Sequence, residues 1–214
     1  MDDNEKGNDL FWVAVKGLSP EKALAALKME YADGAEACDV PGFPDVDDGQ
    51  FSERIFSAQL ADDWLLLFGS IDEIDHQRLI RLARLGPTFV GHKFRSGCFA
   101  EAHWYAEGRE VWSVDYDFES RGRDDQLQIE GKLPEQLAAI IGEAYRAVAM
   151  QIGRDNGIDI LFEVPGKLSK AICGFSPHEP LPDGFRWSML QPIGGMPEPA
   201  PAPHGWLSRL FGRR

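Results

Sequence analysis

A histidine, two hydroxyl groups and several carboxylates occupy alternate positions in two neighbouring segments, residues 98–105 and 110–118. Side chains of these types carry out acid–base and nucleophilic catalysis in enzymes. Because alternate residues of a β-strand lie on the same face, a hairpin of these segments would gather them on one surface. The set comprises Glu101, His103, Tyr105, Ser113, Asp115 and Asp117.

The length of the loop around Gly108 decides which side chains share that surface. A loop of even length would place Glu101 and His103 beside Trp112. A three-residue loop, with Gly108 in the left-handed conformation, instead places Trp104 beside Trp112 on an apolar face. We predict the second register because it leaves the whole polar set, His103 and Asp115 included, on the opposite face.

No catalytic signature surrounds the polar set. Ser113 does not lie in a G-x-S-x-G sequence, which is the usual context of a serine nucleophile in hydrolases. An antiparallel sheet with one face in water routinely carries such polar residues. We therefore expect this face to be solvated or to bind a partner, without enzymatic activity. Its candidate partner-binding residues are Glu101, His103, Asp115 and Asp117.

Motifs for metal ions and nucleotides are incomplete. Residues 45–49, DVDDG, resemble the start of a calcium loop. Gly49 comes one place too early, however, and Phe56 stands where a bidentate glutamate is needed. Cys98 and His103 are an odd number of residues apart and would point to opposite faces of a strand, which is unsuitable for zinc. The chain has no Walker sequence and no G-x-G-x-x-G motif. We predict no metal site and no cofactor.

Hydrophobic periodicity predicts the elements that hold this hairpin. Besides the two strands already named, short apolar or alternating runs predict strands at 11–16, 52–60, 64–69, 88–94 and 126–131. Helical spacing predicts helices over 20–31, 71–85 and 134–152, and a short helix over 167–173. A meander of four strands without intervening helices favours an α+β fold. We predict an antiparallel sheet with the helices packed on one face.

Length and composition fit one cytoplasmic domain. A chain of 214 residues with 43% apolar residues can bury a full core, and we assign residues 1–190 to a single domain. Its longest apolar stretches are too short for a signal peptide or a transmembrane helix. The three cysteines, Cys38, Cys98 and Cys173, are odd in number and widely spaced, which favours the reduced thiols of the cytoplasm.

The chain is strongly acidic, with a formal net charge of −13. This balance argues against nucleic acid as a partner, because phosphate binding requires Lys and Arg, and it suits a basic protein. Acidic residues are dense in residues 33–63, and the Gly, Pro and Asp content of residues 33–50 predicts a long loop. We identify Asp45, Asp47 and Asp48 in this loop as candidate binding residues for a basic partner, for example a toxin domain.

The end of the chain holds a second candidate contact. Residues 191–205 are rich in proline and predict a linker. Residues 206–214, WLSRLFGRR, are apolar and basic, with Trp206 and Phe211 on the apolar side of a helical projection. Nine residues are too few to hold a helix alone. The peptide would therefore fold on contact, in a protein groove or, more weakly, on an anionic membrane.

Four segments together resemble a group of uncharacterised bacterial cytosolic proteins. They are residues 111–117 (VWSVDYD), 127–134 (LQIEGKLP), 158–165 (IDILFEVP) and 168–175 (LSKAICGF), followed by His178 and Glu179. The similarity spans residues 11–181 and leaves out the Pro-rich end. Proteins of this kind are of the type seen among immunity proteins of bacterial toxin systems. The resemblance implies that the protein sequesters a partner, and it assigns no functional residue.

The sequence therefore favours a cytoplasmic binding protein, an immunity protein that occludes a toxin domain with its acidic surface. The first alternative is an adapter that docks on a membrane or a partner through residues 206–214. The second alternative is an unrecognised hydrolase.

Overall fold

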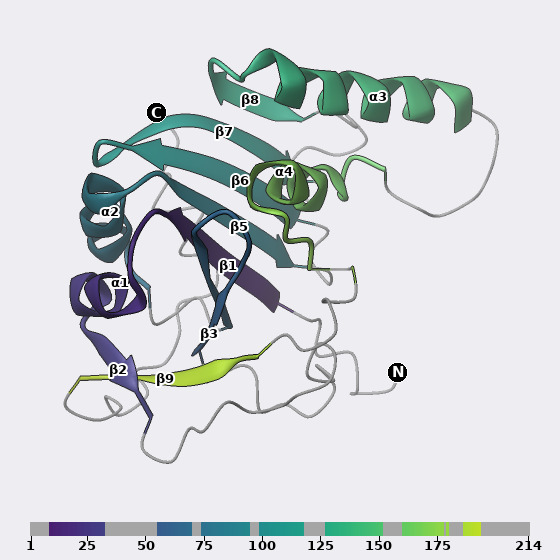
Figure 1. Cartoon of the computed structure of the whole chain (residues 1–214). Helices are drawn as coiled ribbons and strands as arrows, with labels where there is room; N and C mark the ends of the chain where they lie inside the picture. Colours follow the sequence, from purple (N-terminus) through teal and green to yellow (C-terminus); the bar gives the residue numbers. More distant parts are fainter. Residues whose placement is uncertain are drawn as a thin grey trace.

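The computed structural model describes residues 9–32, 55–69, 74–94, 99–117, 127–151, 160–177, 179 and 186–193. Within these ranges the chain forms one antiparallel sheet with four helices packed against it (Figure 1). The predicted α+β class and the antiparallel sheet are therefore confirmed. No helix in the described part of the chain is long and apolar enough to span a membrane.

The elements follow one another with strands concentrated in the middle of the chain. In order they are β1 (Asp9–Lys16), α1 (Pro20–Leu27), β2 (Met29–Tyr31), β3 (Ile55–Gln59), β4 (Trp64–Gly69), α2 (His76–Leu85), β5 (Thr88–Phe94), β6 (Phe99–Ala106), β7 (Arg109–Asp117), β8 (Gln128–Gly131), α3 (Glu135–Gln151), α4 (Val164–Cys173) and β9 (Ser188–Pro192).

The strand order in the sheet is β2-β9-β3-β4-β1-β5-β6-β7-β8. Strand β1 is central and pairs with β4 on one side and β5 on the other. From β5 to β8 the strands are neighbours in the sequence and in the sheet, which is the predicted meander. Among the described strands, β8 has a sheet neighbour on one side only, so it forms an edge of this sheet.

Local signals explain where the first two helices begin and end. Pro20 is the first residue of α1, where its missing N–H costs nothing. Lys28 then adopts a left-handed conformation with φ of 56°, so the helix ends before β2. We had predicted that it would continue to Tyr31. Helix α2 begins after Asp75, whose side chain accepts a hydrogen bond of 2.7 Å from the backbone N–H of Arg78.

Both faces of the sheet are covered by helices. On β1, Trp12 and Ala14 belong to the core under α3 and α4, whereas Phe11 and Val13 belong to the core under α1 and α2. The prediction that all helices pack on one face of the sheet is therefore wrong. The reason is that β1 and β4 are apolar on both sides, and each apolar side must be shielded from water.

The last described strand extends the sheet beyond the predicted limit of the domain. Strand β9 pairs with both β2 and β3. It includes Gln191 and Pro192, two residues that the sequence analysis placed in the proline-rich linker. Pro192 stands at the last position of the strand, where the loss of one backbone donor is tolerated.

Candidate functional site

The register between β6 and β7 determines which polar side chains meet. Trp104 lies opposite Trp112, and Glu101 lies opposite Asp115. His103 shares the face of Asp115, with 3.7 Å between His103 Nε2 and Asp115 Oδ1. The predicted register, with the two tryptophans on one face and His103 with Asp115 on the other, is confirmed.

The register arises in a different way from the one predicted. The turn holds only two residues, Glu107 and Gly108, with φ of 55° and 72°, where we expected three. The pairing of β6 with β7 then shifts by one residue at a β-bulge, in which Val111 is the extra residue. Such a bulge places two residues of one strand against one of the other, so it restores the register of a three-residue loop.

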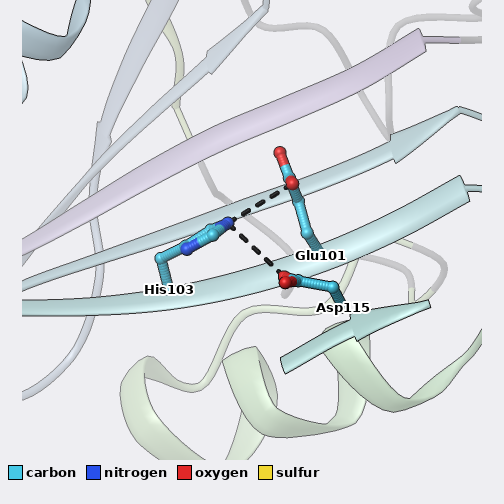
Figure 2. A group of neighbouring side chains, drawn as sticks. All are labelled: Glu101, His103 and Asp115. Carbon is cyan, nitrogen blue, oxygen red and sulfur yellow. Dashed lines mark ion pairs between the residues drawn. The ribbon is translucent and has the colours of Figure 1, made fainter. Parts of the chain in front are cut away.

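Glu101, His103 and Asp115 form a compact cluster on this face (Figure 2). His103 Nε2 lies 3.4 Å from Glu101 Oε2, in addition to its contact with Asp115. Glu101 is 3% exposed and His103 is 1% exposed. The expectation that the polar face lies in water is therefore wrong for these two residues. The face is not an outer surface, because α1 and α2 pack on this side of the sheet.

Three more side chains in the described part of the chain contact this cluster. His92 Nδ1 on β5 lies 3.5 Å from Glu101 Oε1. Glu110 Oε2 on β7 lies 3.4 Å from the other ring nitrogen of His103, Nδ1. The hydroxyl of Tyr105 donates a hydrogen bond of 3.0 Å to the same oxygen of Glu110. His103 therefore has a carboxylate on each side of its ring.

His92 and Glu110 were not among the predicted site residues. Strand β5 places His92 opposite Glu101, a register that we did not derive from the sequence. The available signal was the two-residue spacing of Val90 and His92, which places both side chains on the same face of β5. Strict alternation along residues 110–118 would place Glu110 on the face of Trp112, away from Asp115. The two-residue turn instead pairs Glu110 with Tyr105, and the bulge at Val111 leaves Ser113 and Asp115 on that same face.

Glu101 and His103 determine each other's charge. Burial by itself would raise the pKa of Glu101 and lower the pKa of His103. The contacts with His103 and His92 outweigh burial and hold the pKa of Glu101 well below its usual range. The contacts with Glu101 and Glu110 likewise raise the pKa of His103. Both groups are therefore charged at neutral pH, as a buried ion pair.

The pKa of Asp115 is raised, whereas that of Glu101 is lowered, although both carboxyl groups lie beside His103. Burial is the largest cause and raises its pKa to about 7. The charge of His103 opposes this shift, whereas the carboxylates of Glu101, Glu110 and Glu130 add to it. Several carboxyl groups thus share one imidazolium. Such a set can exchange a proton at Asp115 near neutral pH, or it can bind a further cation.

The remaining predicted site residues are not part of this cluster. Asp117 lies on the same face of β7, two residues beyond Asp115 and opposite Phe99. The other five predicted residues lie outside the described ranges: Asp45, Asp47, Asp48, Trp206 and Phe211. Cys173, the one cysteine in the described ranges, is the last residue of α4 and is buried on the other side of the sheet.

We found no protein-family model, no curated protein and no solved structure that matches this chain. The resemblance to immunity proteins therefore stays a prediction from the sequence.

Proposed function

We propose that this protein binds and occludes a basic protein partner in the bacterial cytoplasm, in the manner of an immunity protein that neutralises a toxin domain. The observation that carries the proposal is a row of carboxylates along β7 and β8. We call this row the acidic edge: it comprises Glu110, Asp115 and Asp117 on β7 and Glu130 on β8.

The geometry of β8 places these carboxylates together. Glu130 lies opposite Ser113, and Gln128 lies opposite Asp115, so both project from the face that carries the β7 carboxylates. All four residues of β8 are exposed. The start of the strand is tied to α3, because the backbone N–H of Leu127 donates a hydrogen bond of 2.8 Å to the hydroxyl of Tyr145. Within the acidic edge, Glu110 and Glu130 are therefore exposed, Asp115 and Asp117 are partly buried, and β8 is attached to α3.

The charges of the acidic edge also favour a basic partner. Glu110 and Glu130 both contribute to the raised pKa of Asp115, which means that these carboxylates repel one another. A Lys or Arg side chain from a partner would offset this repulsion and would steer the approach of the two proteins. Ile129, on the opposite face of β8, is 44% exposed and offers an apolar contact beside the charges.

Binding fits this face better than hydrolysis does. Ser113 lies opposite His103, as a nucleophile and base would. Both side chains are buried, however, so a substrate has no direct access to them in this conformation. Occlusion of a partner requires only the exposed carboxylates. The net charge of −13 supports the same choice, since it attracts cationic surfaces over a distance of about a Debye length.

The test begins with the partner. The full chain is used to isolate interacting proteins from its source organism, and mass spectrometry identifies them; we expect a basic protein. Its association rate is then measured by stopped flow with the Asp117→Asn/Glu130→Gln double variant. We expect slower association at low salt and a weaker dependence on salt than with the unmodified chain.

The matched control removes the same charge from another surface. Glu135 and Glu143 are both exposed on α3, and the Glu135→Gln/Glu143→Gln variant should leave the association rate close to that of the unmodified chain. Equal slowing by both double variants would show that only net charge matters. Recovery of no basic partner would contradict the proposed function itself.

A further inference from the structure

Glu101, His103 and Asp115 bring three potential metal ligands to one place between β6 and β7 (Figure 2). One imidazole nitrogen and two carboxylate oxygens lie within 4.8 Å of one another. His103 Nε2 is 3.4 Å from the Glu101 oxygen and 3.7 Å from the Asp115 oxygen. Around a tetrahedral zinc ion, bonds of about 2.0–2.2 Å hold neighbouring ligands about 3.3–3.6 Å apart. The measured distances are close to this spacing.

The same contacts are long for direct hydrogen bonds. A charge-assisted N–H···O bond usually measures about 2.7–2.9 Å. Asp115 Oδ1, the oxygen that faces His103 Nε2, is buried and accepts no hydrogen bond within the described part of the chain. Glu101 Oε1 is in the same position, but it faces His92, whereas Oε2 faces His103. A buried carboxylate oxygen without a hydrogen bond is costly. A bond from Asp115 Oδ1 to a metal ion would remove this cost for that oxygen, while Glu101 would bind the ion through Oε2.

The surroundings of His103 are those of a metal-binding histidine. Such a residue usually directs its second ring nitrogen at a carboxylate, which fixes the ring and increases the basicity of the ligating nitrogen. Glu110 takes this position, 3.4 Å from His103 Nδ1. Tyr105 holds Glu110 in turn by a hydrogen bond of 3.0 Å. His103 Nε2 is thereby directed at Glu101 and Asp115.

The types of ligand select the kind of ion. Calcium and magnesium take oxygen ligands almost exclusively, whereas zinc, manganese and ferrous iron accept imidazole together with carboxylate. The two carboxylates would also balance the charge of a divalent cation.

We propose that Glu101, His103 and Asp115 bind one divalent transition-metal ion, for which Zn²⁺ is the probe. Three protein ligands leave the fourth position of a tetrahedral ion to a water molecule or to a further side chain. His92, 3.5 Å from Glu101, is the candidate for that position. The site goes beyond the proposed partner binding, although it shares Asp115 with the acidic edge. Alternation along the strands predicted that the three side chains share a face, but it indicated neither their burial nor their spacing.

The experiment uses the full chain, treated with EDTA and then freed of chelator. Calorimetric titration with ZnCl₂ should give one ion per chain, and titration with CoCl₂ should give the visible absorption of a bound ion. Asp115→Asn should weaken zinc binding at least tenfold. Glu110→Gln should weaken it by about 10–100-fold, as is typical when a carboxylate behind a ligating histidine is removed.

Asp117→Asn is the matched control, because Asp117 lies on the same strand and face but outside the ligand group. Its zinc affinity should equal that of the unmodified chain. Asp115 is only partly buried, so its substitution should leave the fold intact, and far-UV circular dichroism verifies this. A further variant, His103→Gln, should abolish the cobalt absorption. The proposal is overturned if the unmodified chain binds no zinc at micromolar concentrations. It is equally overturned if Asp115→Asn and Asp117→Asn bind zinc alike, as they would if cysteines held the ion.

Discussion

Trp104 and Trp112 stack across β6 and β7, with ring centroids 6.4 Å apart and ring planes 8° apart. Trp64 meets Trp104 edge-on at 6.2 Å, so the stack belongs to the core beneath α3 and α4. The stack depends on the bulge at Val111, since without it Trp112 would pair with His103. One extra residue therefore keeps the tryptophans and the ionisable cluster on opposite faces.

Deletion of Val111 should destabilise the domain by more than about 3 kcal/mol, the range found when a large aromatic side chain is lost from a core. The reason is that deletion shifts the pairing of residues 112–117 with β6 by one position. Their apolar side chains would then point to the polar face, and their polar side chains would point to the apolar face. Urea unfolding measures the loss, and near-UV circular dichroism reports the tryptophan stack. Val111→Thr keeps the bulge and should change stability by less than about 0.5 kcal/mol. A deletion variant as stable as the unmodified chain would disprove this role of the bulge.

The turn itself offers a pair of opposite predictions. Glu107 has a side chain in the left-handed region, at φ of 55°, which costs about 1–2 kcal/mol for residues other than glycine. Glu107→Gly should therefore raise the free energy of unfolding. Gly108→Ala should lower it by about 1–2 kcal/mol, because φ is 72° and the new Cβ would lie 2.5 Å from Arg84 Cγ. Thermal or urea unfolding of the two variants checks both signs, and changes of the same sign would contradict the turn geometry.

Much of the fold could be predicted because its elements carry local signals. Pro20 and Asp75 mark the starts of two helices, and short apolar or alternating runs located the strands from β3 to β8. Strands β2 and β9 were not predicted, because neither segment alternates clearly and each is stabilised by pairing with a strand far away in the sequence. The placement of helices on both faces was also missed. The continuous apolar sequences of β1 and β4 were the signal for it.

The candidate site could be predicted only in part. Alternation gathered Glu101, His103 and Asp115 on one face, but it did not indicate their burial, since the packing of α1 and α2 against that face is tertiary. His92 comes from a different strand and enters the site through its pairing opposite Glu101. Glu110 enters through the bulge, an irregularity that a periodic pattern cannot contain.

Asp115 should make the stability of the chelated protein depend on pH. Its pKa is raised from 3.8 to about 7, so the folded state holds the proton more tightly than the unfolded chain. The unfolding free energy should therefore fall as pH rises from about 4 to about 7. The Asp115→Asn variant does not lose stability in this way. At pH 7.5 it should be more stable than the unmodified chain by more than about 1 kcal/mol. The groups that face Asp115 and tune this shift are His103, Glu101, Glu110 and Glu130.

Urea unfolding of both proteins in EDTA, at intervals from pH 4 to pH 8, measures this difference. The raised pKa of His103 causes a further loss of stability as pH rises above about 6.5. Asp115 also helps to raise the pKa of His103, so the comparison between pH 4 and about 6.5, where His103 is charged in both proteins, reports Asp115 itself. A difference that stays constant over the whole range would show that the Asp115 carboxyl group titrates normally.

Gly91 should tolerate no side chain, because Trp12 lies against it on the neighbouring strand. A Cβ at Gly91 would lie 2.2 Å from the Trp12 ring, which is itself held by a hydrogen bond of 2.9 Å from Trp12 Nε1 to Ser169 Oγ. Gly91→Ala should destabilise the domain by about 1–3 kcal/mol through overpacking. Gly142→Ala, on α3 with open space around it, is the matched control and should stabilise by about 0.5–1 kcal/mol. Equal effects in urea unfolding would contradict the close approach at Gly91.

Deletion of residues 206–214 distinguishes the acidic edge from the C-terminal peptide as the docking element. Residues 206–214 contain three arginines and no acidic residue, so their deletion makes the chain more acidic. If a basic partner docks on the acidic edge, deletion should leave the association rate at low salt unchanged or increase it. If the peptide is the docking element, deletion should abolish the interaction, while Asp117→Asn/Glu130→Gln should have little effect. Stopped-flow measurements with the isolated partner compare the two variants, and flotation with anionic vesicles tests for a membrane contact. Loss of binding on deletion alone would refute docking at the acidic edge.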